Sequence, residues 1–453
     1  MIVLKFGGTS VGDAAAISRA ADIVAGRRDR RPVVVVSALG GATNALLAIA
    51  EQASSGHLIG AIRGIEVLRE RHLRECDALL ADSPACGEVA AEMSAMFDEL
   101  ASLAEALSTL GHATPRSMDA IAAFGELMSS MLVTEAFRMR GIDAMHIDAR
   151  KVVITDDRFM QAEPKLDMIA DRVRELVLPL VRENKIPVMG GYIGGTMAGV
   201  TTTLGRGGSD YSASLIGATL GVDAIEIWTD VDGMLTADPR VVSGAQLIEQ
   251  IRFDEASELA SFGAKVLHPN TIAPAVRVGI PVFIYNSRNA AGTGTRITFD
   301  APRRPVSAIA GKGDVTVVKV RAPRMLLAYG FLRAVFEIFE RYQTSVDVVS
   351  TSEVSVSVTI DDARRLDALV VDLRALGDVS VERNRGVVAI VGAGIGDQGN
   401  VMGRALLALG DLRVHMMSLS ATGINLTIIV DGMRVNETLR LLHDEFFGTG
   451  NGR

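Results

Sequence analysis

Residues 2–11 read Ile-Val-Leu-Lys-Phe-Gly-Gly-Thr-Ser-Val and decide the fold class. The apolar run Ile2–Phe6 predicts a buried β-strand, and the helical pattern from Asp13 predicts an α-helix directly after the glycine turn. Backbone N–H groups at such a turn and at the following helix start can face an anion, so the glycine pair suits a phosphate. A tight turn with an exposed Lys5 is the plainer alternative. No GxxxxGK[ST] motif occurs, so a P-loop nucleotide site is not supported.

Further Val- and Ile-rich runs alternate with longer helical patterns along the first two thirds of the chain. These runs are 32–37, 142–147, 186–192, 224–229 and 281–285. Such alternation predicts an α/β fold with a mostly parallel sheet sandwiched by helices. Residues 51–140 carry apolar side chains at helical spacing and predict a helical lobe over the sheet. Lys5 would then lie at the carboxyl end of the first strand, where open α/β sheets bind ligands.

Composition excludes several classes of protein. The 453 residues suggest about three domains, and 48% apolar with 22% charged residues indicates a folded, soluble protein. A net charge of −8 without a basic run argues against a nucleic-acid partner. We expect no membrane span, because the long uncharged runs are broken by glycine pairs and polar residues. Cys76 and Cys86 read as free thiols and, with no signal-peptide pattern, favour a cytoplasmic location.

The last third of the chain contains an internal repeat. Segments 315–360 and 387–429 each read strand, glycine turn, helix, strand, serine-rich turn, strand. Gly392–Gly396 begins like a dinucleotide motif, but the third glycine is replaced by Asp397, so that interpretation fails. The expected organisation is a catalytic domain 1–290, a linker 291–308, module one 309–384, module two 385–448 that can interleave with the first, and a polar tail 449–453.

The glycine turn, Lys5-Phe-Gly-Gly-Thr-Ser-Val11, resembles the opening signature of the aspartate kinases. Further motifs agree in the same order, and the similarity extends to about residue 447. They are Phe124-Gly-Glu-Leu-Met-Ser, Thr201-Thr-Thr-Leu-Gly-Arg-Gly-Gly-Ser-Asp210, Trp228-Thr-Asp-Val-Asp-Gly, Asp238-Pro-Arg240 and Phe262-Gly-Ala-Lys-Val-Leu-His-Pro269. The resemblance implies an amino-acid-kinase fold followed by two ACT-like βαββαβ modules, and an enzyme that makes 4-phospho-L-aspartate from ATP and L-aspartate.

Chemical roles follow from the resemblance, position by position. A carboxylate nucleophile is already ionised at neutral pH, so catalysis needs positioning and charge stabilisation more than a base. Lys5 and Lys265 would contact phosphate oxygens, and Asp210 would orient lysines. Phosphate contacts are expected at Gly7, Gly8, Thr9 and Ser10. Substrate contacts are expected at Ser37, Thr43, Glu126, Arg206, Gly207, Gly208 and Ser209, with Glu126 accepting from the ammonium and Arg206 pairing with a carboxylate.

Nucleotide binding is assigned by the same resemblance. The expected residues are Thr229, Asp230, Asp238, Arg240 and Lys265. Leu235 stands where many family members have tyrosine, which puts one adenosine contact in question. ATP chemistry implies Mg²⁺, for which the sequence names no protein ligand. His268 reads as structural.

The first module carries the expected effector site. Asp347 and Glu353 offer two carboxylates, which suits the two ammonium groups of L-lysine better than the one of threonine, although a solvated acidic loop is the plainer alternative. The resemblance to lysine-sensitive aspartate kinases assigns effector contacts to Met325, Gly330, Phe331, Leu332, Val346, Asp347, Ser352, Glu353 and Val354. It also implies a homodimer, or a dimer of dimers, through the ACT modules.

Two other functions stay open at this point. One is a related amino-acid kinase with another carboxylate substrate, such as N-acetylglutamate. An acetylated amine has no ammonium for Glu126, and that family lacks paired ACT modules. The other is an amino-acid sensor with an inactive kinase domain, which would not need the phosphate lysines.

Overall fold

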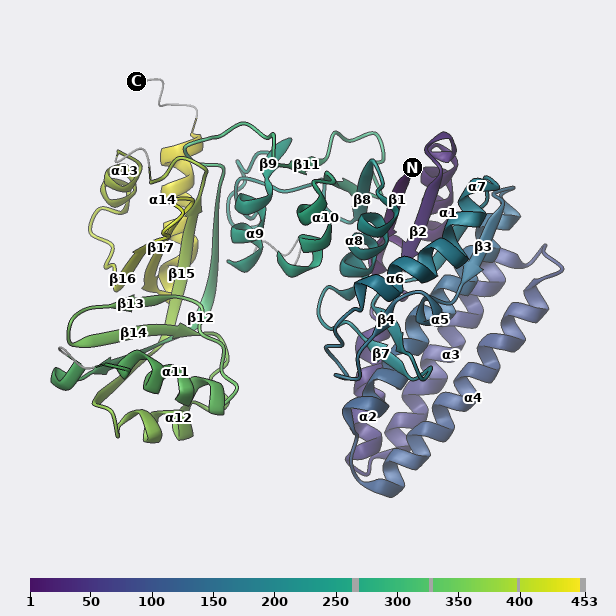
Figure 1. Cartoon of the computed structure of the whole chain (residues 1–453), viewed down its shortest axis with the longest axis horizontal. Helices are drawn as coiled ribbons and strands as arrows, with labels where there is room; N and C mark the ends of the chain where they lie inside the picture. Colours follow the sequence, from purple (N-terminus) through teal and green to yellow (C-terminus); the bar gives the residue numbers. More distant parts are fainter. Residues whose placement is uncertain (263–268, 326–328, 397–399, 449–453) are drawn as a thin grey trace. The chain divides into compact units, whose positions relative to one another are not determined.

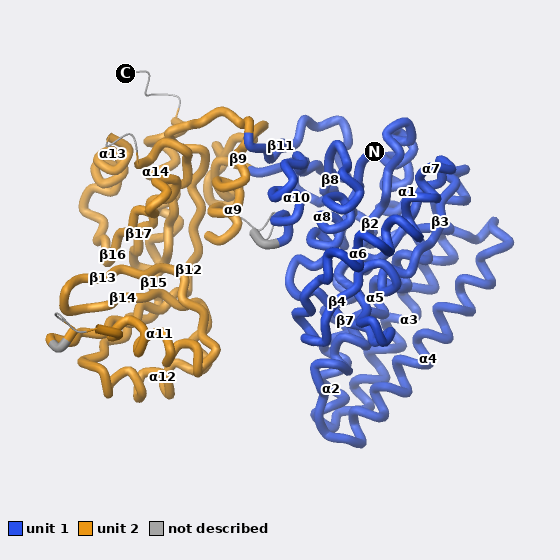
Figure 2. Tube along the Cα trace, in the orientation of Figure 1, with its two compact units in different colours: residues 1–234, 266–299 blue, residues 235–265, 300–453 orange. Residues whose placement is uncertain are grey.

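The protein, seen in a computed structural model, divides into two compact units (Figure 2). The structure describes residues 1–262, 269–325, 329–396 and 400–448. Unit 1 comprises Met1–Met234 and Val266–Phe299, and unit 2 comprises Leu235–Lys265 and Asp300–Arg453.

Unit 1 is built on a sheet in the order β3-β5-β2-β1-β8-β10-β11. Neighbouring strands are parallel except β11, which pairs antiparallel with β10. The strands are β1 (Ile2–Phe6), β2 (Pro32–Val36), β3 (Ala144–Ile147), β5 (Ile186–Gly190), β8 (Ala224–Thr229), β10 (Val282–Asn286) and β11 (Thr295–Thr298). Each strand predicted from a Val- and Ile-rich run is confirmed, and so is the predicted mostly parallel sheet.

Side chains of β1 alternate between the two faces of this sheet, which places helices on both sides. Ile2, Leu4 and Phe6 are buried in one core cluster together with residues of α1 (Ala14–Ala25) and α2 (Ala42–Ser54). Lys5 points the other way, toward α8 (Gly208–Leu220), which packs on β1 and β8.

The predicted helical lobe is confirmed. It consists of α3 (Leu58–Leu80), α4 (Cys86–Leu110) and α5 (Pro115–Met139) (Figure 1). Helix α5 also packs on β2, β3 and β5. Thr114 and Ser117 form a capping box around Pro115, which explains where α5 begins. By length and composition α5 could cross a membrane, but 83% of its most apolar window is buried, which is the placement of a core helix.

Smaller elements complete unit 1. A second sheet, in the order β4-β6-β7, lies beside α5, and β7 contacts that helix. The remaining elements are β4 (Ile154–Thr155), β6 (Ile193–Thr196), β7 (Thr201–Thr203), α6 (Leu166–Arg172), a π-helical turn (Val173–Val177), α7 (Leu178–Arg182), α10 (Ala273–Val278) and 3₁₀ turns at Gly8–Ser10, Arg28–Arg30, Ala149–Lys151 and Pro269–Ile272.

Unit 2 is built on an antiparallel sheet in the order β13-β14-β12-β15-β17-β16. The predicted repeat is present, because a long strand, a helix, two short strands and a helix occur twice (Figure 1). The first copy is β12 (Ala308–Arg321), α11 (Phe331–Arg341), β13 (Val349–Thr351), β14 (Ser355–Ile360) and α12 (Leu366–Leu373). The second is β15 (Asp378–Val391), α13 (Asn400–Leu409), β16 (Met416–Leu419), β17 (Asn425–Asp431) and α14 (Val435–Phe447), with 3₁₀ turns at Pro323–Met325 and Gly432–Arg434.

The two copies share their long strands. Residues 316–321 of β12 pair with β14 on one side and mostly with the first part of β15 on the other. Residues 308–312 of β12 pair with 387–391 of β15, whose other edge pairs with β17. The copies are therefore interleaved, each with its own core cluster against its own helices.

Segment 235–262 packs within unit 2, together with the interleaved sheet. It includes β9 (Gln250–Arg252) and α9 (Phe253–Ser261). Ala237 and Val242 join the core cluster of the second copy, and the Oγ of Ser307 donates to Glu255 at 2.6 Å. The predicted linker 291–308 contains β11, so its first part continues the sheet of unit 1. The predicted domain limits otherwise stay predictions.

Candidate active site

Lys5 and the glycine turn lie at the carboxyl end of the central strand β1. The Nζ of Lys5 is 2.6 Å from Oδ1 of Asp210, in the first turn of α8, and both side chains are largely buried. A Cβ on Gly7 would lie 3.6 Å from the same Nζ, and one on Gly8 would lie 3.1 Å from the carbonyl oxygen of Ala38. Glycine at position 7 therefore keeps a side chain away from the ammonium group, and glycine at position 8 allows the close approach to Ala38.

Ser10 is fully buried and bonded inside the protein. Its hydroxyl lies 2.8 Å from Oγ of Ser287 and 3.1 Å from the carbonyl oxygen of Trp228, and its N–H donates to Gly7 at 2.8 Å. Since both donors are used, the predicted phosphate contact of Ser10 does not fit this geometry. Thr9 is exposed and Gly8 half-buried, so those members of the turn stay accessible.

Arg71, on α3, links the glycine turn to the loop after β2, and sequence reasoning missed it. Its Nη1 donates to the carbonyl oxygen of Gly40 at 2.8 Å and its Nη2 to that of Gly12 at 2.9 Å. The loops touch, because a Cβ on Gly40 would lie 3.1 Å from the carbonyl oxygen of Gly8. One guanidinium fork thus fixes two loops at the strand ends.

Glu126 is a buried carboxylate with one oxygen unpartnered. The residue is 3% exposed, and Oε1 accepts the N–H of Ala38 at 3.2 Å. Oε2 is buried without a hydrogen-bond partner in the described part of the chain. Burial raises the pKa of Glu126 to about 8, because the charged form loses its hydration. A ligand cation at Oε2 would remove that penalty.

The end of β5 lies between Glu126 and the predicted substrate turn, Arg206–Asp210, and contacts both. A Cβ on Gly190 would lie 3.0 Å from that of Glu126, and one on the next residue, Gly191, would lie 2.7 Å from Cα of Ser209. Gly207 has φ +72° and caps α8, so the turn needs glycine there. Arg206 is exposed.

Ser37 and Thr43 flank the same place. The N–H of Ser37 donates to the carbonyl oxygen of Phe6 at 3.0 Å, and the carbonyl oxygen of Ser37 accepts the hydroxyl of Ser129 at 2.7 Å. The hydroxyl of Ser37 is left for a ligand. Thr43 is half-buried on α2, with Oγ1 4.0 Å from the position of a Cβ on Gly125. The predicted phosphate and substrate residues thus come from the segments after β1 and β2, from α2 and α5, and from the turn that begins α8, as expected for a ligand at the carboxyl edge of a parallel sheet.

The predicted nucleotide residues divide between the two units. Thr229 ends β8, and its carbonyl oxygen accepts the N–H of Ser287 at 2.8 Å, while Asp230 is exposed. Asp238 and Arg240 belong to unit 2, where they form an ion pair of 2.6 Å. Lys265 and His268 lie outside the described residues.

The predicted effector segments meet in the first copy of unit 2. The N–H of Met325 donates to the carbonyl oxygen of Ala322 at 2.8 Å, and the N–H of Ala322 donates to the carbonyl oxygen of Val354 at 2.8 Å. Gly330 has φ +80° and caps α11, which begins with the predicted Phe331 and the 41% exposed Leu332. Oγ of Ser352 lies 2.7 Å from that of Ser355. Met325, Phe331 and Val346 pack on the core cluster of this copy.

The two predicted effector carboxylates differ in their surroundings. Asp347 already pairs with Lys312 of β12, whose Nζ lies 3.1 Å from its Oδ2 and 2.5 Å from Oδ2 of Asp361. Glu353 is exposed and forms no ion pair within the described ranges. Glu353 is therefore the freer acceptor for an ammonium group.

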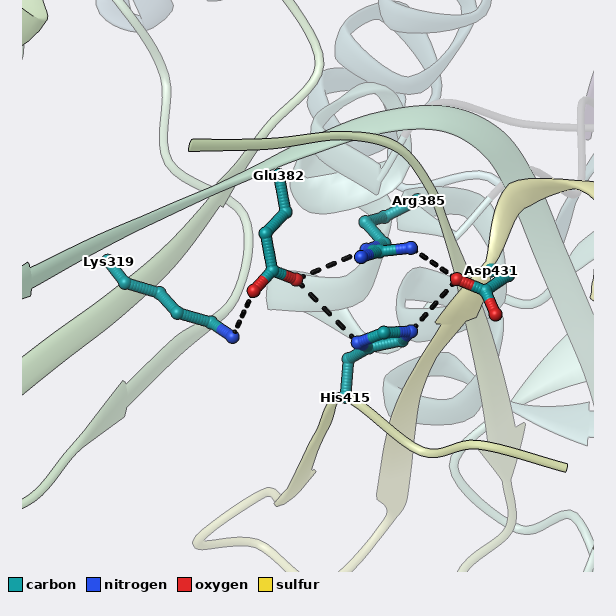
Figure 3. A network of polar contacts seen from close by, with 5 residues as sticks. All are labelled: Lys319, Glu382, Arg385, His415 and Asp431. Atoms are coloured by element: carbon teal, nitrogen blue, oxygen red, sulfur yellow. Dashed lines mark hydrogen bonds and ion pairs between the residues drawn. The ribbon is translucent and has the colours of Figure 1, made fainter. Parts of the chain in front are cut away.

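A charged network joins the two copies of unit 2 and was not predicted (Figure 3). Lys319 of β12 pairs with Glu382 of β15 at 2.6 Å, and Glu382 also approaches Arg385 at 3.2 Å. The ring of His415, whose side chain is 3% exposed, lies between Glu382 (3.6 Å) and Asp431 (2.9 Å), and Arg385 pairs with Asp431 too. The network links both long strands to the end of β17 and to the residue directly before β16.

No group of three or more metal-ligating side chains occurs among the residues that the structure describes. A divalent ion bound with a nucleotide takes most of its ligands from phosphate oxygens and water, with one or two carboxylates. Asp210, which lies beside Lys5, is a carboxylate suited to be one of these few protein ligands.

Comparisons with known proteins agree with this geometry. Residues 1–286 match the family model described as the amino acid kinase family. The chain is 37% identical to the lysine-sensitive aspartokinase 3 of Escherichia coli, over 99% of both chains. It is 36% identical to two structures of E. coli aspartokinase III. The complex with aspartate and ADP has a TM-score of 0.87 (99% of this chain, 100% of that chain), and the complex with lysine and aspartate has 0.82 (99% of both). The chain belongs to the amino acid kinase family and, within it, to the aspartokinases.

Proposed function

We propose that this protein transfers the γ-phosphoryl group of ATP to the side-chain carboxylate of L-aspartate, giving 4-phospho-L-aspartate. The observation that carries the proposal is the unpartnered, buried Oε2 of Glu126. A buried carboxylate oxygen needs a cation or a donor, and the α-ammonium group of an amino acid supplies one. Arg206, on the turn beside Ser209, is the partner for a carboxylate of the same substrate.

The phosphoryl transfer is assigned to the Lys5 side of the site. The acceptor carboxylate is ionised at neutral pH, so no general base is needed. Lys5 neutralises charge on the transferring group, the amides of Gly8 and Thr9 hold its oxygens, and Asp210 orients Lys5. The N–H of the buried Gly7 donates to the carbonyl oxygen of Trp228 at 2.9 Å, so the predicted phosphate contact of Gly7 does not use its amide. Lys265, Thr229, Asp230, Asp238 and Arg240 stay assigned to the nucleotide by family resemblance.

Mg²⁺ is assigned from the chemistry of ATP. When bound, the ion neutralises β- and γ-phosphate oxygens, and Asp210 is the carboxylate that would share in holding it. Localisation in the cytoplasm stays a prediction.

L-Lysine is the proposed feedback effector, and unit 2 carries its site. The E. coli aspartokinase III to which the chain is similar has been solved with lysine. Glu353 supplies the free carboxylate, and Asp347 supplies a second one that shares Lys312. Lysine would favour a low-activity state, with a coupling free energy of about 1–3 kcal/mol. Assembly as a homodimer or a dimer of dimers through the ACT modules belongs to the same proposal.

One assay tests the reaction and separates it from the alternatives. Acyl phosphate formed with ATP and Mg²⁺ is trapped by hydroxylamine, with L-aspartate, L-glutamate or N-acetyl-L-glutamate as acceptor and with or without L-lysine or L-threonine. We expect turnover with aspartate alone, suppressed by lysine. Turnover with N-acetylglutamate would favour the related amino-acid kinase, and lysine binding without any turnover would favour the sensor.

A further inference from the structure

Asp119 is a buried carboxylate that no motif assigned. It lies on α5 and is 1% exposed. Oδ1 accepts the hydroxyl of Thr203 at 2.6 Å, and Oδ2 accepts the N–H of Thr203 at 3.0 Å. The N–H of Met160 lies 3.0 Å from Oδ1 and 2.9 Å from Oδ2. Every one of these bonds reaches a segment at least 41 residues away in sequence.

The bonded groups lead directly into the substrate turn. Thr203 ends β7, three residues before Arg206. Met160 has φ +69°, and its carbonyl oxygen packs against the same turn, because a Cβ on Gly205 would lie 3.1 Å from that oxygen. The carbonyl oxygen of Thr203 also accepts the N–H of Ala162 at 2.9 Å. Asp119 thus fixes both segments that set where the turn begins.

Asp119 shares a face of α5 with Glu126. The two residues are seven positions apart, which is close to two helical turns, or about 10 Å along the axis. One rigid helix therefore carries both Glu126, which accepts from the substrate ammonium group, and Asp119, which holds the turn that carries Arg206. The distance between these two contacts is set by the helix rather than by a flexible connection.

We propose that Asp119 is a positioning residue that sets the span between Glu126 and Arg206, and so determines affinity for an α-amino dicarboxylate. The inference rests on the proposed function, because it takes Arg206 and Glu126 as substrate contacts. Without the carboxylate, the N–H groups of Thr203 and Met160 lose a buried acceptor, and the start of the turn is held only by its backbone bonds to neighbouring segments. The nucleotide side of the site, at the ends of β1 and β8, is untouched.

Steady-state kinetics of Asp119→Ala, Asp119→Asn and Thr203→Val test this inference. We expect KM for aspartate to rise about tenfold or more in Asp119→Ala, with KM for ATP changed by less than about twofold. Asp119→Asn recovers part of the loss, because its Oδ1 still accepts one bond. Thr203→Val keeps the size of the side chain and removes only the hydroxyl that donates to Asp119, so it tests the contact even if Asp119→Ala does not fold.

Thr202→Val is the matched control on the same strand. Its hydroxyl bonds to Thr155 at 2.7 Å and not to Asp119, so KM for aspartate should stay at the wild-type value. Melting temperatures of all variants report stability separately. Equal rises in both KM values, or a lower melting temperature with an unchanged KM for aspartate, would overturn the positioning role. If the wild-type protein makes no aspartyl phosphate, the proposed function itself fails. That outcome is distinct from a failure of the positioning role, which leaves wild-type activity intact.

Discussion

Lys5 of β1 and Asp210 of α8 form an ion pair, with Nζ and Oδ1 2.6 Å apart, although 205 positions separate them in the sequence. Both side chains are mostly shielded from solvent, so the pair fixes the lysine head group before any ligand arrives. A preorganised cation is what charge stabilisation in phosphoryl transfer requires.

Lys5→Met should reduce kcat by about 10²–10³-fold, the usual cost of removing one electrostatic contact to a transition state. Asp210→Asn should also reduce kcat, because Lys5 loses the carboxylate that orients it and Mg²⁺ loses the carboxylate that would share in holding it. Hydroxylamine trapping at saturating aspartate and ATP measures both. Lys185→Met removes a lysine that pairs with Glu183 on the surface and serves as the control. Unchanged kcat in Lys5→Met would exclude Lys5 from the transfer step.

Aspartate binding should release a proton near neutral pH. Glu126 has a pKa of about 8 in the free protein, so it is mostly protonated at pH 7, and an ammonium partner lowers that pKa. KM for aspartate should therefore fall as pH rises from about 6.5 to 8.5. Calorimetry in buffers of different ionisation enthalpy counts the proton. In Glu126→Gln, KM should rise and its dependence on pH through this window should flatten. A wild-type KM that does not change with pH would contradict an ionising Glu126.

The same residue predicts how stability depends on pH. The folded pKa of about 8 exceeds the ordinary 4.5, so the folded state holds the extra proton and stability falls as pH rises between these values. Glu126→Gln cannot ionise. Its melting temperature, relative to wild type, should therefore be higher at pH 8.5 than at pH 5, in the absence of aspartate. A difference in melting temperature that is the same at both pH values would reject this linkage.

Arg71→Met should lower kcat/KM by about tenfold or more, because the loops that carry Gly12 and Gly40 lose their common donor. Arg71→Lys should restore little, since an ammonium group cannot reproduce the guanidinium fork. Arg69→Met is the matched control on the same helix, where Arg69 bonds to Asp98 instead. Equal activity of the Arg71 and Arg69 variants would mean that the fork has no part in catalysis.

Glu353→Gln should weaken lysine inhibition more than Asp347→Asn does. Lys312 already neutralises part of the Asp347 charge, whereas Glu353 is exposed and can pair fully with an ammonium group. The concentration of lysine that halves activity measures the difference, and activity without lysine should be unchanged in both. A larger effect at Asp347 would reverse this order, and no effect at either would remove both from the effector site.

The sequence predicted what local patterns control. Strand β1 and the glycine turn follow from ten consecutive residues, and the helices of the lobe follow from apolar periodicity. Asp119 and Arg71 could not be found this way, because their partners lie 31 or more positions away and a single Asp or Arg on a helix normally faces solvent. The one available signal was spacing, since Asp119 precedes Glu126 by two helical turns.

Ser10 shows the opposite error. Its place in the glycine motif suggested a phosphate contact, yet its hydroxyl bonds to the end of β8 and to Ser287, which comes directly after β10. A motif reports which residues accompany a site but not which of them face it. Only the packing of strands from distant parts of the chain separates the two.

The shared strands β12 and β15 mean that the repeat of unit 2 cannot be divided by cutting the chain. A break after residue 384 would leave the first copy without the rest of β15 and would leave the second without the edge that 308–312 supply. Neither fragment would own a complete sheet, and each would expose unpaired backbone groups along a long edge. The two copies must therefore fold as one cooperative unit, and the effector segments of the first copy share a strand with the second.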